Sequence, residues 1–315
     1  MKDYKGSREA VTMALLELAE QDPRFMLVSA DSLKAMRATE FAERFPDRYI
    51  EVGIAEQNAM AVSAGLASCG LIPYVASYCG FLTMRACEQL RTFVAYPHLN
   101  VRIVGINGGL YGGEREGVTH QFFEDLGIVS SIPGITVVTP ADESQVYQAV
   151  KATATLEGPV YIRCGSGREP VVFDRNEPFV FGKLHMVKEY GRDAAIFASG
   201  FLMKRAIAAA EQLNGEGVHV TLCDVHTLKP LDEVGTAAIL SRCGAAVTVE
   251  DHNIIGGLGS AITDAAASLC PVPVEKIGLR DIFPSSGEAE ALVDYYGMSV
   301  EDIKTAVRKV VERKQ

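Results

Sequence analysis

The stretch RYIEVGIAEQNAMAVSAGLA (residues 48–67) decides how the first half of the chain is interpreted. Its opening residues predict a short strand that ends near Val52, and a glycine then separates this strand from a helix beginning at Glu56. The helix is rich in Ala, Ser and Gly, so we expect it to pack closely against another helix or backbone. A carboxylate in a first helical turn is common, because it complements the helix dipole. Taken alone, Glu56 is therefore most simply a helix-start charge.

The rest of the chain continues the same alternation of helical periodicity and short β-branched runs. This alternation predicts an α/β fold with mainly parallel sheets flanked by helices. We expect a first domain over residues 1–166 and a second over residues 184–315. Between them, residues 167–183 lose the periodicity and become polar, charged and Pro-containing, which predicts an interdomain linker.

Composition excludes several classes of function. The 315 residues carry a formal net charge of −10, which argues against non-specific binding to nucleic acid or to an anionic membrane surface. No apolar run approaches the roughly 20 residues that span a bilayer, and the N-terminal residues do not resemble a signal peptide. The seven cysteines form no CxxC pair, so we expect reduced thiols in a cytoplasmic protein and no structural zinc site.

Two further segments contain candidate site residues. PYVASYCGFLTMRACEQLR (residues 73–91) places Tyr78 and Phe81 where a strand meets a helix predicted over residues 82–95. Core packing is the ordinary explanation for such an aromatic pair. NGGLYGGEREGVTHQ (residues 107–121) contains five glycines, and we expect a long loop that builds no core and contacts a ligand. The loop lacks the pattern of a nucleotide-binding P-loop.

The order and spacing of these segments carry a family resemblance. Four motifs resemble the pyrimidine-binding domain of transketolases: GIAEQ (53–57), PYxxxYxxF (73–81), GVTHQ (117–121) and SIPGITVVTPADESQV (131–146). The same succession occurs in deoxyxylulose-phosphate synthases and in beta subunits of 2-oxoacid dehydrogenases. Three later motifs resemble the C-terminal domain of that superfamily: LKPLD (228–232), VEDHNIIGGLGS (249–260) and DYYGMSVEDI (294–303). The resemblance covers nearly the whole chain and implies an enzyme that uses thiamine diphosphate.

The resemblance implies a cofactor-binding role for four residues. Glu56 matches the glutamate that hydrogen-bonds N1′ of the cofactor's aminopyrimidine, which favours the imino tautomer that removes the thiazolium proton. Phe81 matches the aromatic residue that stacks on the pyrimidine, and Tyr78 matches a second aromatic beside it. Asp31, in SADSL, resembles an aspartate near the cofactor, although a structural role in a dimer is an equal alternative.

The same comparison suggests substrate-binding residues. His120 matches a histidine near the donor hydroxyls and the reacting carbon. Alternatively, it is simply a hydrogen-bonded histidine at a helix start. Glu116 stands where transketolases have an aspartate that recognises a donor hydroxyl. Arg163 and Arg168 are the nearest candidates for phosphate binding, because guanidinium grips phosphate bidentately. Charges on a linker surface are the commoner explanation for these arginines.

One expected part of the site is missing from the sequence. Family members bind the diphosphate through Mg²⁺ held by a GDG motif and a following asparagine, and no GDG occurs in these 315 residues. We therefore expect an N-terminal partner subunit to hold the magnesium and the diphosphate, while this chain binds the pyrimidine. The implied assembly is a heterotetramer with a self-dimer of this chain at its centre.

The leading hypothesis is the C-terminal subunit of a thiamine diphosphate-dependent transketolase. Together with its partner, such a subunit moves a two-carbon ketol unit between sugar phosphates. The enzymatic alternative is a deoxyxylulose-phosphate synthase-like or 2-oxoacid dehydrogenase beta-type subunit. The non-enzymatic alternative is a scaffold subunit that keeps the fold without the chemistry. Retention of Glu56, Tyr78, Phe81 and His120 in order counts against the scaffold, because a degraded site would lose some of them.

Overall fold

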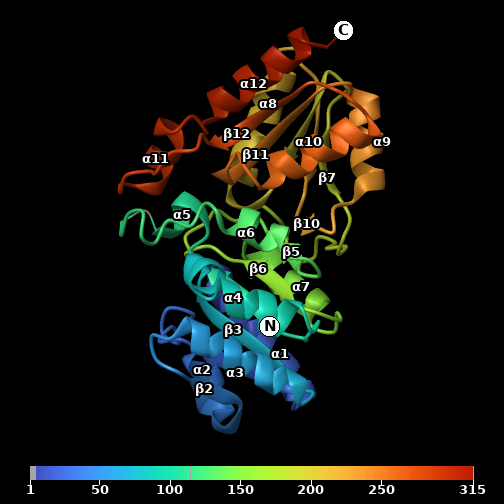
Figure 1. The fold of residues 1–315 in the computed structure, drawn as a ribbon. Helices are drawn as coiled ribbons and strands as arrows, with labels where there is room; N and C mark the ends of the chain where they lie inside the picture. The colour runs from blue at the N-terminus through green and yellow to red at the C-terminus, as the bar shows by residue number, and fades with distance from the viewer. Residues whose placement is uncertain (1–4, 114, 315) are drawn as a thin grey trace.

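Two sheets organise the computed structural model, which describes residues 5–113 and 115–314 (Figure 1). The first sheet has seven strands in the order β10-β5-β6-β4-β3-β1-β2, and all neighbouring pairs are parallel except β10 with β5. Its strands are β1 (Phe25–Ser29), β2 (Tyr49–Glu51), β3 (Ile72–Tyr78), β4 (Arg102–Ile106), β5 (Thr136–Val138), β6 (Val160–Arg163) and β10 (Thr227–Lys229). The segments packed around it are α1 (Ser7–Gln21), α2 (Thr39–Arg44), η1 (Pro46–Arg48), α3 (Glu56–Ser68), η2 (Phe81–Arg85), α4 (Cys87–Gln89), η3 (Leu90–Ala95), α6 (Asp125–Ser131) and α7 (Glu143–Thr153). The short helix α5 (Gly109–Gly113) packs against the second unit.

The second sheet has five strands in the order β12-β11-β8-β9-β7, parallel except for β7 with β9. Its strands are β7 (His185–Glu189), β8 (Ala194–Ala198), β9 (Val220–Asp224), β11 (Ala246–Asn253) and β12 (Val274–Leu279). Its helices are η4 (Gly200–Leu202), α8 (Met203–Gly215), α9 (Glu233–Cys243), α10 (Leu258–Leu269), α11 (Ala289–Tyr295) and α12 (Val300–Glu312). The predicted fold class, two α/β units with mainly parallel sheets, is confirmed.

Burial on both faces explains why several strand sequences are almost entirely apolar. Every residue of β1, β4, β8 and β9 is buried, as expected when helices cover both faces of a parallel sheet. The last helix, α12, begins at Val300. Ser299 and Asp302 form a capping box there, satisfying backbone N–H groups that the helix leaves unpaired. None of the described residues belongs to a helix that is both long and apolar enough to cross a bilayer.

The helix predicted over residues 82–95 is wrong in its geometry. Two π-helical segments, η2 and η3, flank the short α-helix α4. The wider turn is visible in the backbone, because Ala86 N–H donates to the Phe81 carbonyl five residues earlier at 3.2 Å. The Thr83 hydroxyl donates to the Cys79 carbonyl at 2.8 Å, a side-chain bond that competes with regular helix bonding. π-Helical turns often occur at functional sites.

The glycine-rich loop predicted over residues 107–118 is also partly wrong. Its first half forms the short helix α5, whose Leu110 and Tyr111 are buried in the core of the second α/β unit. Glycine makes this packing possible: Gly109 has φ +70°, and a Cβ there would lie 2.0 Å from the Asp251 carboxylate. The expectation that this segment builds no core fails, because its glycines let the backbone approach the second unit.

The two α/β units share backbone contacts that the sequence did not reveal. Strand β10 comes from the second half of the chain yet pairs with β5 at the edge of the first sheet. Beside it, Thr139 N–H donates to the His226 carbonyl at 2.8 Å. The segment predicted as a linker contains no helix or strand, but Asp142 accepts hydrogen bonds from Val172 and Phe173 N–H. These bonds fix the linker against the N-terminus of α7.

Gly109→Ala tests the contact between α5 and the second unit. The substitution forces a side chain into a left-handed backbone and against Asp251, so we expect a loss of about 2 kcal/mol or more in unfolding free energy. Urea unfolding followed by circular dichroism measures this loss. Gly215→Ala is the matched control, because its Cβ meets nothing within 4 Å, and we expect no loss there. An equal response of the two variants would contradict the close-approach explanation.

Candidate active site

Three neighbouring strands bring the predicted cofactor residues to one edge of the first sheet. Strands β3, β1 and β2 lie side by side and run parallel, so their carboxyl ends share an edge. Tyr78 ends β3, Asp31 follows β1, and Glu56 begins the helix after β2. Ligands of open α/β sheets bind at such an edge. Residues far apart in sequence are thus collected by strand order alone.

Glu56 begins α3 with its carboxylate almost fully buried, at 2% exposure. The turn before it is held by Glu51, whose carboxylate accepts N–H bonds from Gly53 at 2.9 Å and Asp31 at 2.7 Å. Arg85 Nη1 donates to Glu56 Oε2 at 2.6 Å. A buried carboxylate needs a partner to offset its lost hydration, and in this structure Arg85 is that partner.

Tyr78, Phe81 and His120 form one aromatic cluster. The Tyr78 and Phe81 rings lie 5.6 Å apart between centroids, and His120 lies edge-on to both at 5.3 and 5.4 Å. Phe122 packs behind Phe81 at 5.3 Å. Gly80 allows this packing, because a Cβ there would lie 2.0 Å from the Phe122 ring. The structure therefore brings together the three residues that the sequence singled out.

Arg85 is the functional residue that sequence reasoning missed. Its guanidinium carbon lies 4.2 Å from the centroid of the Phe81 ring while its Nη1 binds Glu56. The available signal was its spacing, because residues four apart on a helix face the same side and Arg85 follows Phe81 by four. The arrangement shows that a flat hydrogen-bond donor fits between the Phe81 ring and the Glu56 carboxylate.

Asp31 and Glu116 lie at the margin of this cluster. Asp31 is exposed, has φ 51°, and contacts the Glu56 turn through its backbone N–H on Glu51. Glu116 is exposed on the segment that leads from α5 to His120. The structure therefore places Asp31 beside the predicted cofactor residues and leaves the Glu116 side chain in solvent.

Two family models match the chain. The one described as "Transketolase, pyrimidine binding domain" matches residues 5–167, more than half of the chain. The chain belongs to the transketolase family. A second model, "Transketolase, C-terminal domain", matches residues 182–303. The transketolase resemblance seen in the sequence is thus confirmed over both α/β units.

Relatives of similar length are subunits of split transketolases. The 6-deoxy-6-sulfo-D-fructose transketolase subunit SqwH of Clostridium sp. is 38% identical over 98% of this chain and 95% of its own length. An apulose-4-phosphate transketolase subunit of Phocaeicola vulgatus is 33% identical over 96% and 97%. A solved structure described as "Split gene transketolase, inactive beta4 tetramer" matches with TM-score 0.91 and 37% identity, covering 99% of this chain and all of that one. This chain is likewise the C-terminal subunit type of a split transketolase.

Arg163 does not lie where the sequence placed it. The side chain is 3% exposed and lies inside the contact between the two units of this transketolase subunit. Its Nε donates to Asp125 Oδ2 at 2.9 Å, and its Nη2 donates to the carbonyls of Phe122 and Asp251 at 3.1 and 3.0 Å. Burial alone would raise the pKa of Asp125, but Arg163 holds it below its ordinary value. With these donors engaged in a buried site, Arg163 is part of the contact between the two units, and a role in substrate phosphate binding stays a prediction.

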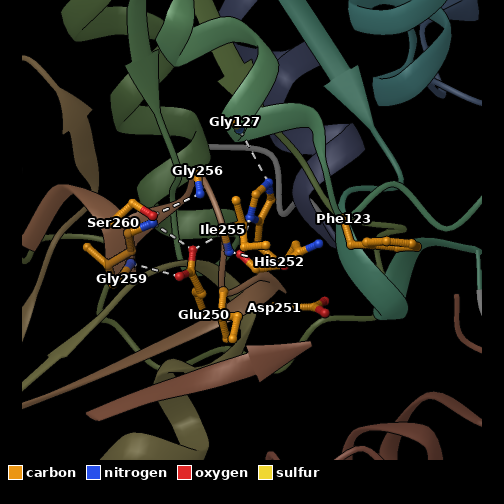
Figure 2. A network of polar contacts seen from close by, with 12 residues as sticks. Phe123, Gly127, Glu250, Asp251, His252, Ile255, Gly256, Gly259 and Ser260 are labelled. Carbon is orange, nitrogen blue, oxygen red and sulfur yellow. Dashed lines mark hydrogen bonds and ion pairs between the residues drawn. The ribbon is translucent and has the colours of Figure 1, made fainter. Parts of the chain in front are cut away.

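A polar network continues from Asp251 to the start of α10 (Figure 2). His252 Nδ1 donates to the Asn253 carbonyl at 2.7 Å, and its Nε2 accepts from Gly127 N–H at 3.4 Å. Burial lowers the pKa of His252 to about 4, so the ring is neutral at physiological pH. This histidine connects α6 of the first unit to β11 of the second.

Glu250 holds the first turn of α10. Its carboxylate accepts hydrogen bonds from Leu258 N–H at 2.6 Å and Gly259 N–H at 2.7 Å. Burial nevertheless raises the pKa of Glu250 to about 7, because desolvation of the charged form outweighs these bonds. Within the described ranges, 5–113 and 115–314, no group of three or more His, Cys, Asp or Glu side chains is arranged to hold a metal ion.

Glu250 predicts a pH dependence of stability. Its folded pKa of about 7 lies above the ordinary value of 4.5, so folding takes up a proton between these two values. The stabilising contribution is present below pH 4.5 and is lost as pH rises through 7, by about 3 kcal/mol in total. In Glu250→Gln, which cannot titrate, we expect this part of the pH slope to disappear. Urea unfolding at pH 5, 6, 7 and 8 measures it.

The matched control for that experiment is Glu233→Gln, an exposed glutamate in the first turn of α9. It should keep the wild-type pH slope. Identical slopes for wild type and Glu250→Gln would show that Glu250 does not take up a proton on folding.

Proposed function

We propose that this chain supplies the catalytic glutamate of a thiamine diphosphate-dependent transketolase and works only with an N-terminal partner subunit. Together they transfer a two-carbon ketol unit between sugar phosphates. The observation that carries the proposal is the buried Glu56 carboxylate beside the Tyr78–Phe81–His120 cluster. A flat heteroaromatic ring with a nitrogen to be hydrogen-bonded fits this pair of features, as the Arg85 guanidinium illustrates.

Each side chain has a separate part in the proposed reaction. Thiamine diphosphate, when bound, supplies the nucleophilic carbon that accepts the two-carbon unit. Glu56 holds a proton at the pyrimidine N1′, and its burial keeps water from competing for that position. Phe81 and Tyr78 hold the ring by stacking. The stacking geometry contributes roughly 0.5–1.5 kcal/mol of binding free energy beyond the contribution of the buried area.

His120 is placed to contact the substrate. Its Nδ1 lies 3.0 Å from the Thr119 hydroxyl, so Nε2 is the nitrogen that remains for a sugar hydroxyl. The ring packs edge-on against both Tyr78 and Phe81, which restricts its orientation. Of the other candidates, Asp31 remains a proposed cofactor contact, and the exposed Glu116 remains a proposed contact of a donor hydroxyl.

The need for a partner follows from what surrounds the cluster. Ile54, close to Glu56 in sequence, is 76% exposed, and Met84, close to Phe81, is 41% exposed. Exposed apolar side chains beside a site favour contact with another chain. The names of the related subunits support the same interpretation. We propose that the partner holds Mg²⁺ and the diphosphate and that the complex is cytoplasmic. We also propose that this chain self-dimerises through α3 and the helical segment that begins at Leu82.

The alternatives have weaker support. Synthases of 1-deoxy-D-xylulose-5-phosphate also match, but this chain covers only 46% of the length of the one from Syntrophotalea carbinolica. They share the family without sharing the split organisation. A non-catalytic scaffold does not require a buried carboxylate, Glu56, next to the Tyr78–Phe81–His120 cluster. The experiment on Glu56 separates the scaffold from the enzyme.

Glu56→Gln in the complex with the partner subunit tests the catalytic assignment. Glutamine keeps the size of the side chain but cannot share a carboxyl proton with N1′. We expect kcat to fall by about 10²–10⁴-fold, the range typical of general acid–base groups. Exchange of the cofactor C2 proton in deuterium oxide should slow in parallel. If Glu56→Gln exchanges the C2 proton at the wild-type rate, Glu56 has no catalytic role and is only a charge at the start of α3.

Phe81→Ala is the companion change. It removes the stacking surface and leaves the Glu56 carboxylate in place, so cofactor affinity should fall more than kcat at saturating cofactor. Steady-state turnover against thiamine diphosphate concentration measures both quantities. The opposite pattern, a lower kcat with unchanged affinity, would show that Phe81 does not hold the ring.

The isolated chain gives a further prediction. It contains the pyrimidine side of the site only, so we expect negligible binding of thiamine diphosphate in the presence of Mg²⁺ and absence of the partner. Isothermal titration calorimetry at micromolar protein measures this directly. Micromolar affinity without the partner would contradict the division of the cofactor between two chains.

A further inference from the structure

Arg85 makes both contacts that the proposed function assigns to the cofactor's pyrimidine. It donates to Glu56 Oε2 at 2.6 Å, and its guanidinium carbon lies 4.2 Å from the Phe81 ring centroid. We propose that Arg85 occupies the pyrimidine position in the cofactor-free chain, so cofactor binding is an exchange in which the ring displaces the guanidinium. This inference rests on the proposed roles of Glu56 and Phe81.

The chemical match is close. Guanidinium is planar and delocalised, stacks on aromatic faces, and presents N–H donors to a carboxylate. An aminopyrimidine is also planar, stacks on the same faces, and when protonated donates from N1′. Both groups satisfy a carboxylate on one edge and an aromatic ring on one face. Two such groups cannot occupy the same face of Phe81 and the same oxygen of Glu56 together.

Arg85 lies over the Phe81 ring, with its guanidinium carbon 4.2 Å from the ring centroid. Tyr78, His120 and Phe122 pack around the ring at centroid distances of 5.6, 5.4 and 5.3 Å, and Phe122 is buried. Arg85 is 46% exposed and lies toward solvent. A ring that stacks at this position on Phe81 must displace Arg85.

Arg85 is held firmly enough to occupy the position and weakly enough to leave it. Its partners are one carboxylate and one aromatic face, and its own side chain remains half in water. Ion pairs and cation–π contacts at such exposed sites are individually weak. Arg85 is the last residue of the π-helical segment η2, which begins at Phe81.

The exchange has a physical advantage for an incomplete site. Without a cofactor, the Glu56 carboxylate would be buried and unpaired, which is costly for the folded chain. Arg85 supplies the missing partner until the assembled complex offers a better one. Because the guanidinium competes with the pyrimidine, it weakens cofactor binding both to the lone chain and to the complex.

The test measures thiamine diphosphate affinity by calorimetry, with Mg²⁺, in the complex of this chain with its N-terminal partner subunit. Arg85→Met keeps most of the side-chain length and removes the planar cation, so we expect cofactor to bind about five- to tenfold more tightly. Arg85→Lys keeps the charge without the planar group and should fall between Met and wild type. Arg91→Met removes the same charge nearby, where Arg91 contacts the Thr92 hydroxyl at 3.5 Å, and should leave affinity unchanged.

A second measurement uses the isolated full chain. Arg85→Met leaves the buried Glu56 carboxylate without its partner, so the melting temperature of this variant should be lower than that of the wild-type chain. In the double variant, Glu56→Gln removes the buried charge and should restore much of the lost melting temperature. Unchanged or weaker cofactor affinity in both Arg85→Met and Arg85→Lys would overturn the exchange. The exchange rate of the cofactor C2 proton in Glu56→Gln separates the two proposals. If this exchange is slow but Arg85→Met leaves cofactor affinity unchanged, only the role of Arg85 is wrong. If Glu56→Gln exchanges the proton at the wild-type rate, the proposed function is wrong.

Discussion

The buried pair between Arg163 and Asp125 is the interaction on which the remaining architecture depends. Two opposite charges in a fully buried position are stabilising only when their remaining donors and acceptors are satisfied. Arg163 meets this condition by also donating to the carbonyls of Phe122 and Asp251, which belong to different α/β units. The pair therefore fixes β6, the segment before α6, and β11 in one relative position. His120 lies two residues before Phe122, so the position of this histidine depends on the same contacts.

The polar interface and the aromatic site share one segment of chain. Residues Gly109–Gly113 fold as α5, in which the Leu110 and Tyr111 N–H groups donate to the Asp251 carboxylate, while the following residues lead to His120 and Phe122. The short helix visible between the two units in Figure 1 is this segment. Glycines make the arrangement possible, because a Cβ at Gly109 or Gly113 would collide with a neighbouring atom at 2.0 Å. Packing of the second unit thus determines how His120 approaches Tyr78 and Phe81.

A divided site needs a way to tolerate being incomplete. In the proposed role, Glu56 acts on a cofactor nitrogen from a buried position, yet a buried carboxylate without a partner destabilises the fold. The ion pair with Arg85 resolves this conflict inside one chain. The same logic explains why Arg85 is half exposed: a fully buried pair would be too costly to separate when a ring arrives.

The sequence by itself determined the fold class and the family, because motif order and hydrophobic period are local properties of the chain. It also predicted Glu56, Tyr78, Phe81 and His120 as pyrimidine-side residues; strand order brings Tyr78 and Glu56 to one edge, and packing of the segment after α5 brings His120 to them. Tertiary structure alone decided that Arg163 joins Asp125, that α5 enters the second core, and that β10 completes the first sheet. It also decided that Arg85 lies on Phe81 and Glu56. Most of these contacts join residues that are distant in sequence, and they form only when the two units pack together. The contact of Arg85 with Phe81 depends instead on the local π-helical turn.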